Sequence, residues 1–292
     1  MHAMAYPEPG TAEMLGGAMF RPLKRAIAAE VSAVFNDRNR GERPVTRRGD
    51  SILGRGSVAW RVHGDVAGMM VGGIAGLLLQ MLHPSVLAGV WDHSAFRSDM
   101  QGRLRRTARF IALTTYGARD EAEQAIARVR KIHGHVRGTL PDGTPYVAND
   151  PRLLAWVHVT ETTTFLAGWV RYAEPRMTLA DQDRYFAEMA EIGQALGADP
   201  VPRGKAEARH LIAAMRAELR SDARTREMVE TLLNRRADNP MAEPIFRLTG
   251  QSAIDLLPDW ARRMHSLPAP AFAPLVRAGT LGVARTLRWA FT

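Results

Sequence analysis

The chain has 292 residues, 46% of them apolar, a formal net charge of +9 and no cysteine. This length suits one large domain or two small ones, and the apolar fraction is enough to build a buried core. The lack of cysteine excludes disulfides, thiolate catalysis, zinc–cysteine sites and a cysteinate haem ligand.

The positive charge comes almost entirely from arginine, because Lys24, Lys131 and Lys205 are the only lysines. The arginines are spread along the chain and interleaved with acidic residues. No basic run with interleaved aromatics and no zinc-finger spacing is present, so the pattern does not favour a nucleic-acid partner. Residues 7–10 lack the basic-then-apolar pattern of a signal peptide, and we therefore expect a cytoplasmic protein.

Helical periodicity dominates, and no alternating strand or two-residue hairpin pattern is evident. We therefore predict a single all-α domain over residues 1–292. Its first helix is expected at about 12–35, and a polar, arginine-rich connector follows at 36–57. Asp65 can cap the glycine-rich run 66–82, which is short for a membrane span. A buried core helix is the favoured interpretation, because small residues let another helix or a flat ligand come close.

Further helices follow in chain order. They are expected at 99–117, 121–138, 151–172, 179–196, 204–220, 224–236 and 241–256. The final stretch, 275–291, sets apolar residues against three arginines. This pattern is compatible with an amphipathic helix that makes peripheral membrane contact, but it more often belongs to a last helix docked on its own domain. Both interpretations stay open.

A histidine lies within the apolar stripe of the segment 121–138. The stripe has the spacing of one helix face and comprises Ala122, Ala125, Ile126, Val129, Ile132 and Val136. His133 falls inside the stripe, whereas His135 lines up with the charged side of the helix. An imidazole in an apolar seam can be a metal or haem ligand, or a core histidine whose nitrogens are satisfied.

Two other segments carry candidate site residues. On the helix at 99–117, one face presents Arg103, Arg106, Thr107, Phe110 and Thr114. Two cations and two hydroxyls beside an aromatic ring could line a pocket, bind a propionate or orient dioxygen near a metal, and the alternative is a solvated face. On the helix at 151–172, His158 and Glu161 lie one turn apart and could be metal ligands or a hydrogen-bonded core pair.

Two further patterns point to chemistry less specifically. Glu207 and His210 form a second Glu-x-x-His step, but a di-iron bundle needs two more carboxylates that are not evident, so non-haem iron is an alternative only. Asp92, His93 and Ser94 suggest a hydrolase, yet no nucleophile elbow, phosphate loop or zinc-protease motif accompanies them.

Several motifs together resemble a known family. They are Gln80-Met81-Leu82-His83-Pro84, Ala88-Gly89-Val90, His93-Ser94, Arg103-Leu104-Arg105-Arg106-Thr107, His133-x-x-Val136-x-Gly138, Asp150-Pro151 and Trp156-Val157-His158. In order and spacing they resemble the oxygenase family that includes the fungal MpaB enzymes and the catalytic domain of bacterial latex-clearing proteins (rubber oxygenases). The match is best over residues 64–172.

The resemblance implies a globin-like helical core that binds haem b and uses dioxygen on a small apolar substrate. Carried over, Arg103 and Thr107 match the family's pocket arginine and threonine. Arg106 stands where latex-clearing proteins have a lysine that can approach the iron. Guanidinium is a poor iron ligand, so the distal position would be open or water-filled.

By the same resemblance, His133 matches the proximal histidine that holds the iron, and His158 matches a second histidine of structural or pocket-lining role. Phe110 and Arg103 are expected beside the cofactor. The spacing between the arginine–threonine step and His133 is slightly shorter than in rubber oxygenases, which leaves His135 and His158 as alternative ligands. A haem-binding sensor or carrier and a cofactor-free helical binding protein are the competing functions. Oligomeric state is not predicted.

Overall fold

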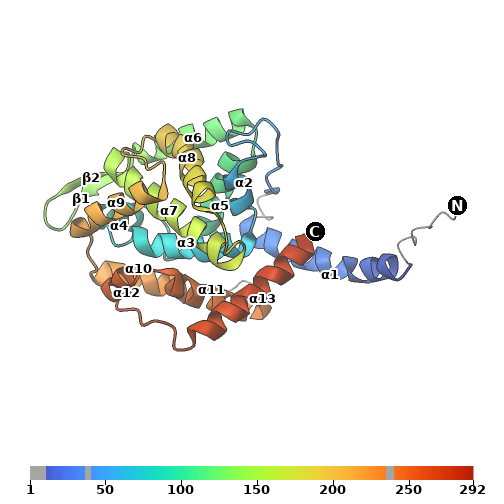
Figure 1. Cartoon of the computed structure of the whole chain (residues 1–292). Coiled ribbons are helices and arrows are strands. Elements are labelled where there is room, and N and C mark those ends of the chain that lie inside the picture. The colour runs from blue at the N-terminus through green and yellow to red at the C-terminus, as the bar shows by residue number, and fades with distance from the viewer. Residues whose placement is uncertain (1–10, 37–40, 235–239, 292) are drawn as a thin grey trace.

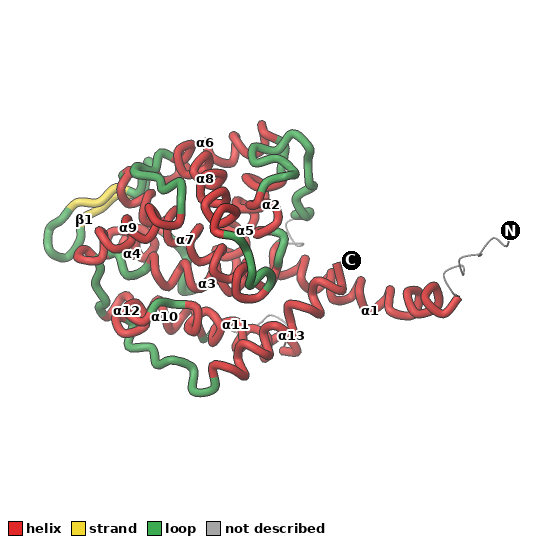
Figure 2. Tube along the Cα trace, viewed as in Figure 1, coloured by secondary structure: helices red, strands yellow, loops and turns green. Residues whose placement is uncertain are grey.

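The computed structural model describes residues 11–36, 41–234 and 240–291, and nearly every element in them is a helix (Figures 1 and 2). The thirteen α-helices of these residues are α1 Thr11–Phe35, α2 Val58–His63, α3 Val66–Gln80, α4 Pro84–His93, α5 Met100–Tyr116, α6 Arg119–His133, α7 Pro151–Tyr172, α8 Leu179–Leu196, α9 Lys205–Met215, α10 Ala223–Leu233, α11 Glu243–Leu256, α12 Asp259–Met264 and α13 Ala273–Phe291. The all-α prediction is confirmed.

Aspartates fix the starts of three helices that carry the core and the predicted site. The side chain of Asp65 accepts a hydrogen bond from the backbone N–H of Gly68 at the start of α3. Asp99 does the same for Gly102 in α5, and Asp150 caps α7 with Pro151 in its first turn. Each carboxylate satisfies a donor that a helix start leaves unpaired, and its charge suits the positive end of the helix dipole.

The centre of the molecule is the close crossing of α3 and α7, which glycines make possible. A Cβ placed on Gly72 would lie 2.7 Å from the carbonyl oxygen of Thr164, and one on Gly168 would lie 2.5 Å from that of Gly68. Any larger residue would push the two backbones apart. The prediction of a buried core helix in the glycine-rich run is therefore confirmed, and what comes close to it is another helix.

The other helices cover this central pair on two sides. Helices α11 and α13 pack on α3, and α8 and α9 pack on α7 (Figure 1). Helices α5 and α6 lie against each other on the side of α2 and α8. Buried apolar residues from α2 to α12 form one continuous core.

The structure also contains a short hairpin, which no sequence pattern indicated. Helix α6 ends at His133 rather than at 138, and β1 (Arg137–Thr139) pairs antiparallel with β2 (Pro145–Val147). Gly143, with φ of 88°, turns the chain between the strands. Strands of three residues are too short to show the alternating pattern by which strands are recognised.

Several helix boundaries also differ from prediction. Helix α9 ends at Met215 and continues as one 3₁₀ turn, Arg216–Glu218, while α11 starts at Glu243 after a 3₁₀ turn at Pro240–Ala242. Helices α2, α4 and α12 were not predicted. The predicted end of α10, at 236, lies outside the described residues, and residues 41–57 of the connector contain no helix or strand.

Within the described residues, no single helix is long and apolar enough to cross a membrane. The bent pair formed by α3 and α4 passes by length and composition alone, with 105° between the two helices.

Helix α13 docks on its own domain through two arginines. Arg288 donates from Nε to Asp65 Oδ2 at 2.6 Å, so one carboxylate both caps α3 and holds the last helix. Arg277 donates twice to Asp255 of α11, at 2.8 and 2.9 Å. The docked interpretation of the final stretch is thus confirmed for one side of α13.

Candidate functional site

His133 is the last residue of α6, half-buried beside α5. Its Nδ1 is buried and has no hydrogen-bond partner. Burial, and then the positive charge of Arg103, lower the pKa of His133, so the imidazole is neutral at pH 7. A neutral imidazole with an unused ring nitrogen has the chemistry of a metal ligand.

The stripe around His133 is less buried than its spacing indicates. Ala122 and Ile126 are buried, but Ile132 is 54% exposed, because α6 ends here and the chain turns away into the hairpin. His135 lies exposed beyond the helix end, with its Nδ1 2.8 Å from the Lys131 carbonyl oxygen. Its expected position on the solvent side is confirmed.

Arg103, in the first half of α5, is a cation without a counter-charge. Within the described residues its guanidinium has no hydrogen-bond or ion-pair partner. Burial, and then the charge of Arg106, lower its pKa to about 10. The group remains charged at pH 7, and no carboxylate of the described residues neutralises it.

The other two residues carried over from the family lie toward solvent. Arg106 is exposed and donates to Asp99 Oδ2 at 3.1 Å. The hydroxyl of Thr107 is also exposed and donates to the Arg103 carbonyl oxygen at 3.2 Å. Phe110, one turn further along the same helix, is half-buried.

Helix α7 carries His158 and Glu161 in its buried central turns. The edge of the His158 ring lies against α8, where a Cβ on Gly193 would be 2.9 Å from Nε2. Burial lowers the pKa of His158 to about 4 and raises that of Glu161 to about 7. No hydrogen bond joins these two side chains within the described residues, so the structure does not show the hydrogen-bonded core pair.

Next to Glu161 lies a buried polar chain that no sequence pattern indicated. His63 Nδ1 lies 2.7 Å from the Thr115 hydroxyl, and its Nε2 lies 2.9 Å from the Tyr185 hydroxyl. Burial, and then the charges of Glu161 and Glu188, raise the pKa of Tyr185 well above its usual value. The groups come from α2, α5 and α8, so no spacing within one segment could reveal them.

The part of α5 that carries the site residues is only partly buried. Between Gln101 and Leu113 none of its residues is fully buried, including the apolar Leu104, Phe110 and Ile111. Helix α5 packs along α6 and contacts α1 and α2, but in the described part of the chain it does not pack closely on α7. Arg103 and Phe110 both lie in this half-buried stretch of α5, whereas Leu104 and Ile111 pack against the core.

Other sequence candidates are not brought into a site. Asp92 accepts a hydrogen bond from Tyr146 at 2.8 Å, His93 Nε2 lies 3.1 Å from the Arg137 carbonyl oxygen, and Ser94 donates to Val90, so no catalytic triad forms. Glu207 and His210 are exposed on α9. In the described ranges, no three His, Asp or Glu residues are grouped as a metal site.

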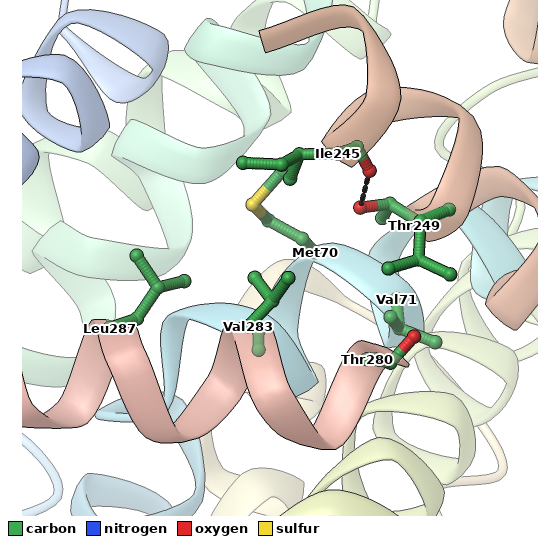
Figure 3. A pocket seen from close by; sticks show the side chains of 9 residues that line it. Met70, Val71, Ile245, Thr249, Thr280, Val283 and Leu287 are labelled. Carbon is green, nitrogen blue, oxygen red and sulfur yellow. Dashed lines mark hydrogen bonds between the residues drawn. The ribbon is translucent and has the colours of Figure 1, made fainter. Parts of the chain in front are cut away.

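Two hollows lie elsewhere. A small one of about 20 Å³ is enclosed by apolar residues of α3, α11 and α13, including Met70, Ile245 and Val283 (Figure 3). This is about the room of one water molecule, too little for an organic substrate. A wider depression of about 380 Å³ opens between α6 and α8, lined by Ile126, Arg130 and Ala195 among others. Neither hollow is lined by His133, Arg103 or His158.

A family model described as "ER-bound oxygenase mpaB/B'/Rubber oxygenase, catalytic domain" matches residues 60–289. The chain belongs to this family. The match includes every candidate site residue from Arg103 to Glu161 and extends through most of α13. No curated protein and no solved structure matches the chain.

The residues of this MpaB/rubber-oxygenase domain fit a haem in three respects. His133 offers a neutral imidazole whose Nδ1 is buried without a partner. Arg103 offers a cation that lacks an acidic partner in the described chain, as a haem propionate requires. Phe110, on the same helix as Arg103, offers a half-buried aromatic ring. The family membership itself supports an oxygenase-type function.

Proposed function

We propose that the chain is a haem b-dependent oxygenase that acts with dioxygen on a small apolar substrate, and that His133 holds the iron. The single observation that carries the proposal is the buried, unpartnered Nδ1 of a neutral histidine beside an unpartnered Arg103. Burying a polar atom without a partner costs stability, so such an atom is typical of a site that a ligand completes.

Each side chain would contribute a different element of binding. The His133 imidazole would bind the metal, and burial, with the positive charge of Arg103 on the neighbouring helix, lowers its pKa and so favours its neutral form. Arg103 attracts a carboxylate of the cofactor. Phe110 and its apolar neighbours on α5 contact the macrocycle or the substrate and exclude water. His158, buried on α7 with a lowered pKa, would have a structural role between α7 and α8. When bound, haem iron supplies the binding and activation of dioxygen.

Arg106 and Thr107 would act at the oxygen-binding side. Guanidinium stays protonated and binds iron poorly, and Arg106 is already paired with Asp99. Arg106 would therefore not compete with dioxygen for the iron. The Thr107 hydroxyl now donates its hydrogen bond to the Arg103 carbonyl oxygen. Because a hydroxyl can rotate, it could donate to dioxygen instead.

The test is the absorption spectrum and iron content of protein expressed with ample iron and haem precursor. We expect a Soret band in the parent protein and its loss in His133→Ala. The matched control is His135→Ala, which removes an exposed imidazole two residues later and should keep the band. Colourless parent protein without iron, or equal haem content in parent and His133→Ala, would overturn the proposal.

A further inference from the structure

The last helix carries an exposed face without acidic residues. No aspartate or glutamate occurs between Ser266 and Phe291. Of its arginines, Arg277 and Arg288 pair with buried carboxylates of the domain. Arg285 is exposed and has no partner in the described part of the chain. The positive charge of α13 is therefore compensated on its docked side only.

Helix α1 adds apolar and positively charged residues to the same surface. It extends away from the helical body, and the C-terminal end of α13 lies beside its base (Figure 1). The Phe20 and Trp289 rings meet edge to face with centroids 5.7 Å apart, and Lys24 Nζ lies 4.9 Å from the Trp289 ring centroid. These contacts join the two helices into one surface.

Large apolar side chains on this surface remain in contact with water. Phe20 is 43% exposed, Leu23 51% and Phe291 54%, and Trp289 is 36% exposed in spite of its contacts. Arg21 and Arg25 stand exposed among them on α1, without a partner in the described ranges. Aromatic and aliphatic groups beside unpaired cations are the composition of helices that lie in a lipid headgroup layer.

We propose that the α1–α13 surface, comprising Phe20, Arg21, Leu23, Lys24, Arg25, Arg285, Trp289 and Phe291, binds peripherally to a membrane that contains anionic lipids. The apolar side chains enter the boundary of the acyl chains, and the cations contact lipid phosphates. Each such cation near an anionic surface strengthens binding about fivefold at low salt.

Charge argues for this occupant over a second copy of the chain. A two-fold dimer through this surface would bring the same patch of each chain together, and thus cations against cations. An anionic lipid surface neutralises them instead.

Co-sedimentation with vesicles tests the proposal. The full chain is incubated with phosphatidylcholine vesicles, with and without phosphatidylglycerol, at low and high salt. We expect the bound fraction to require phosphatidylglycerol and to fall at high salt. The variant with Arg21→Gln, Arg25→Gln and Arg285→Gln should bind at least about tenfold more weakly. The variant with Trp289→Ser and Phe291→Ser should bind more weakly at both salt concentrations.

The matched control removes three exposed arginines elsewhere, through Arg128→Gln, Arg209→Gln and Arg226→Gln, and so has the same net charge as the first variant. We expect it to bind like the parent. Circular dichroism verifies that every variant folds. Equal binding of both triple variants would overturn the proposal, as would a parent protein that ignores phosphatidylglycerol. So would light scattering that shows a dimer abolished by the Trp289→Ser, Phe291→Ser variant.

Discussion

His158 and Gly193 are in close contact, and the histidine ring of α7 lies against the backbone of α8. A Cβ on Gly193 would be 2.9 Å from Nε2 and 3.0 Å from both Cδ2 and Cε1. Real Cβ atoms do not approach so closely, so this residue fixes both the separation of the two helices and the position of the ring.

Gly193→Ala should therefore destabilise the fold by about 1–3 kcal/mol, because the ring or α8 must move. The measurement is the free energy of unfolding in urea. The control is Gly282→Ala on α13, where a Cβ meets nothing within 4 Å. There the gain in helix propensity should stabilise by up to about 1 kcal/mol. Equal effects of the two substitutions would contradict the close packing of His158 on α8.

Sequence patterns located the helices well where a start signal and an apolar stripe agree. Asp65 caps α3 as predicted, and the helices expected at 99–117 and 151–172 are present as α5 and α7. The same reasoning missed the short hairpin and placed Ile132 in the core, although this residue is 54% exposed. Periodicity identifies one face of a helix but does not reveal where that helix ends, and α6 ends directly after Ile132.

The candidate site was predicted only in part for a related reason. Spacing along one helix brought out Arg103 with Phe110, and His158 with Glu161. The hydrogen bonds of His63 with Thr115 and Tyr185 join three helices, so they depend on how these helices pack. Likewise, the spacing of His158 and Glu161 indicated a pair, yet the approach of Gly193 fixes the histidine ring against α8. Packing between distant segments decides such contacts.

Glu161 should make stability depend on pH. Burial raises its pKa from the usual 4.5 to about 7. The folded state therefore binds this proton more tightly than the unfolded state, and stability falls as the pH rises from 4.5 through 7. Glu161→Gln removes the buried charge, so the variant should be more stable than the parent at pH 8, by about 1–3 kcal/mol. At pH 5 the difference should be smaller.

Urea unfolding of both proteins at pH 5, 6, 7 and 8 measures this difference. The control is Glu191→Gln, which changes an exposed carboxylate on α8. Its stability relative to the parent should be nearly the same at every pH. If the Glu161→Gln difference were as flat with pH as that of the control, the carboxylate would be ionised without cost and the burial argument would be wrong.

Asp255 should be the most sensitive ion-pair residue of the C-terminal helices. Its side chain is 4% exposed and forms ion pairs with Arg277 and Arg171. Arg171 Nη1 lies 2.7 Å from Asp255 Oδ2. Burial alone would raise the pKa of Asp255, but its arginine partners hold it below the usual value. Asp255→Asn should destabilise by about 2–3 kcal/mol, because it leaves two guanidinium groups without their counter-charge.

Thermal unfolding monitored by circular dichroism measures the loss. Asp259→Asn is the control, since that aspartate pairs with Arg262 but is 72% exposed, and exposed pairs contribute little. We expect a clear fall in melting temperature for Asp255→Asn and almost none for Asp259→Asn. Similar melting temperatures in the two variants would mean that Asp255 is not the anchor of α13.

Arg103 allows folding and cofactor binding to be separated. Because its guanidinium is buried near α6 without a partner in the described residues, Arg103→Leu removes no ion pair and relieves an uncompensated charge. The variant without cofactor should be at least as stable as the parent in urea.

If Arg103 holds a propionate, the same variant should retain less haem after gel filtration, because its affinity for haem falls by about tenfold or more. Arg128→Leu, an exposed change on α6, should alter neither property. Unchanged haem retention in Arg103→Leu would show that this cation faces no carboxylate of the cofactor, and a loss of stability would show that it has a structural partner.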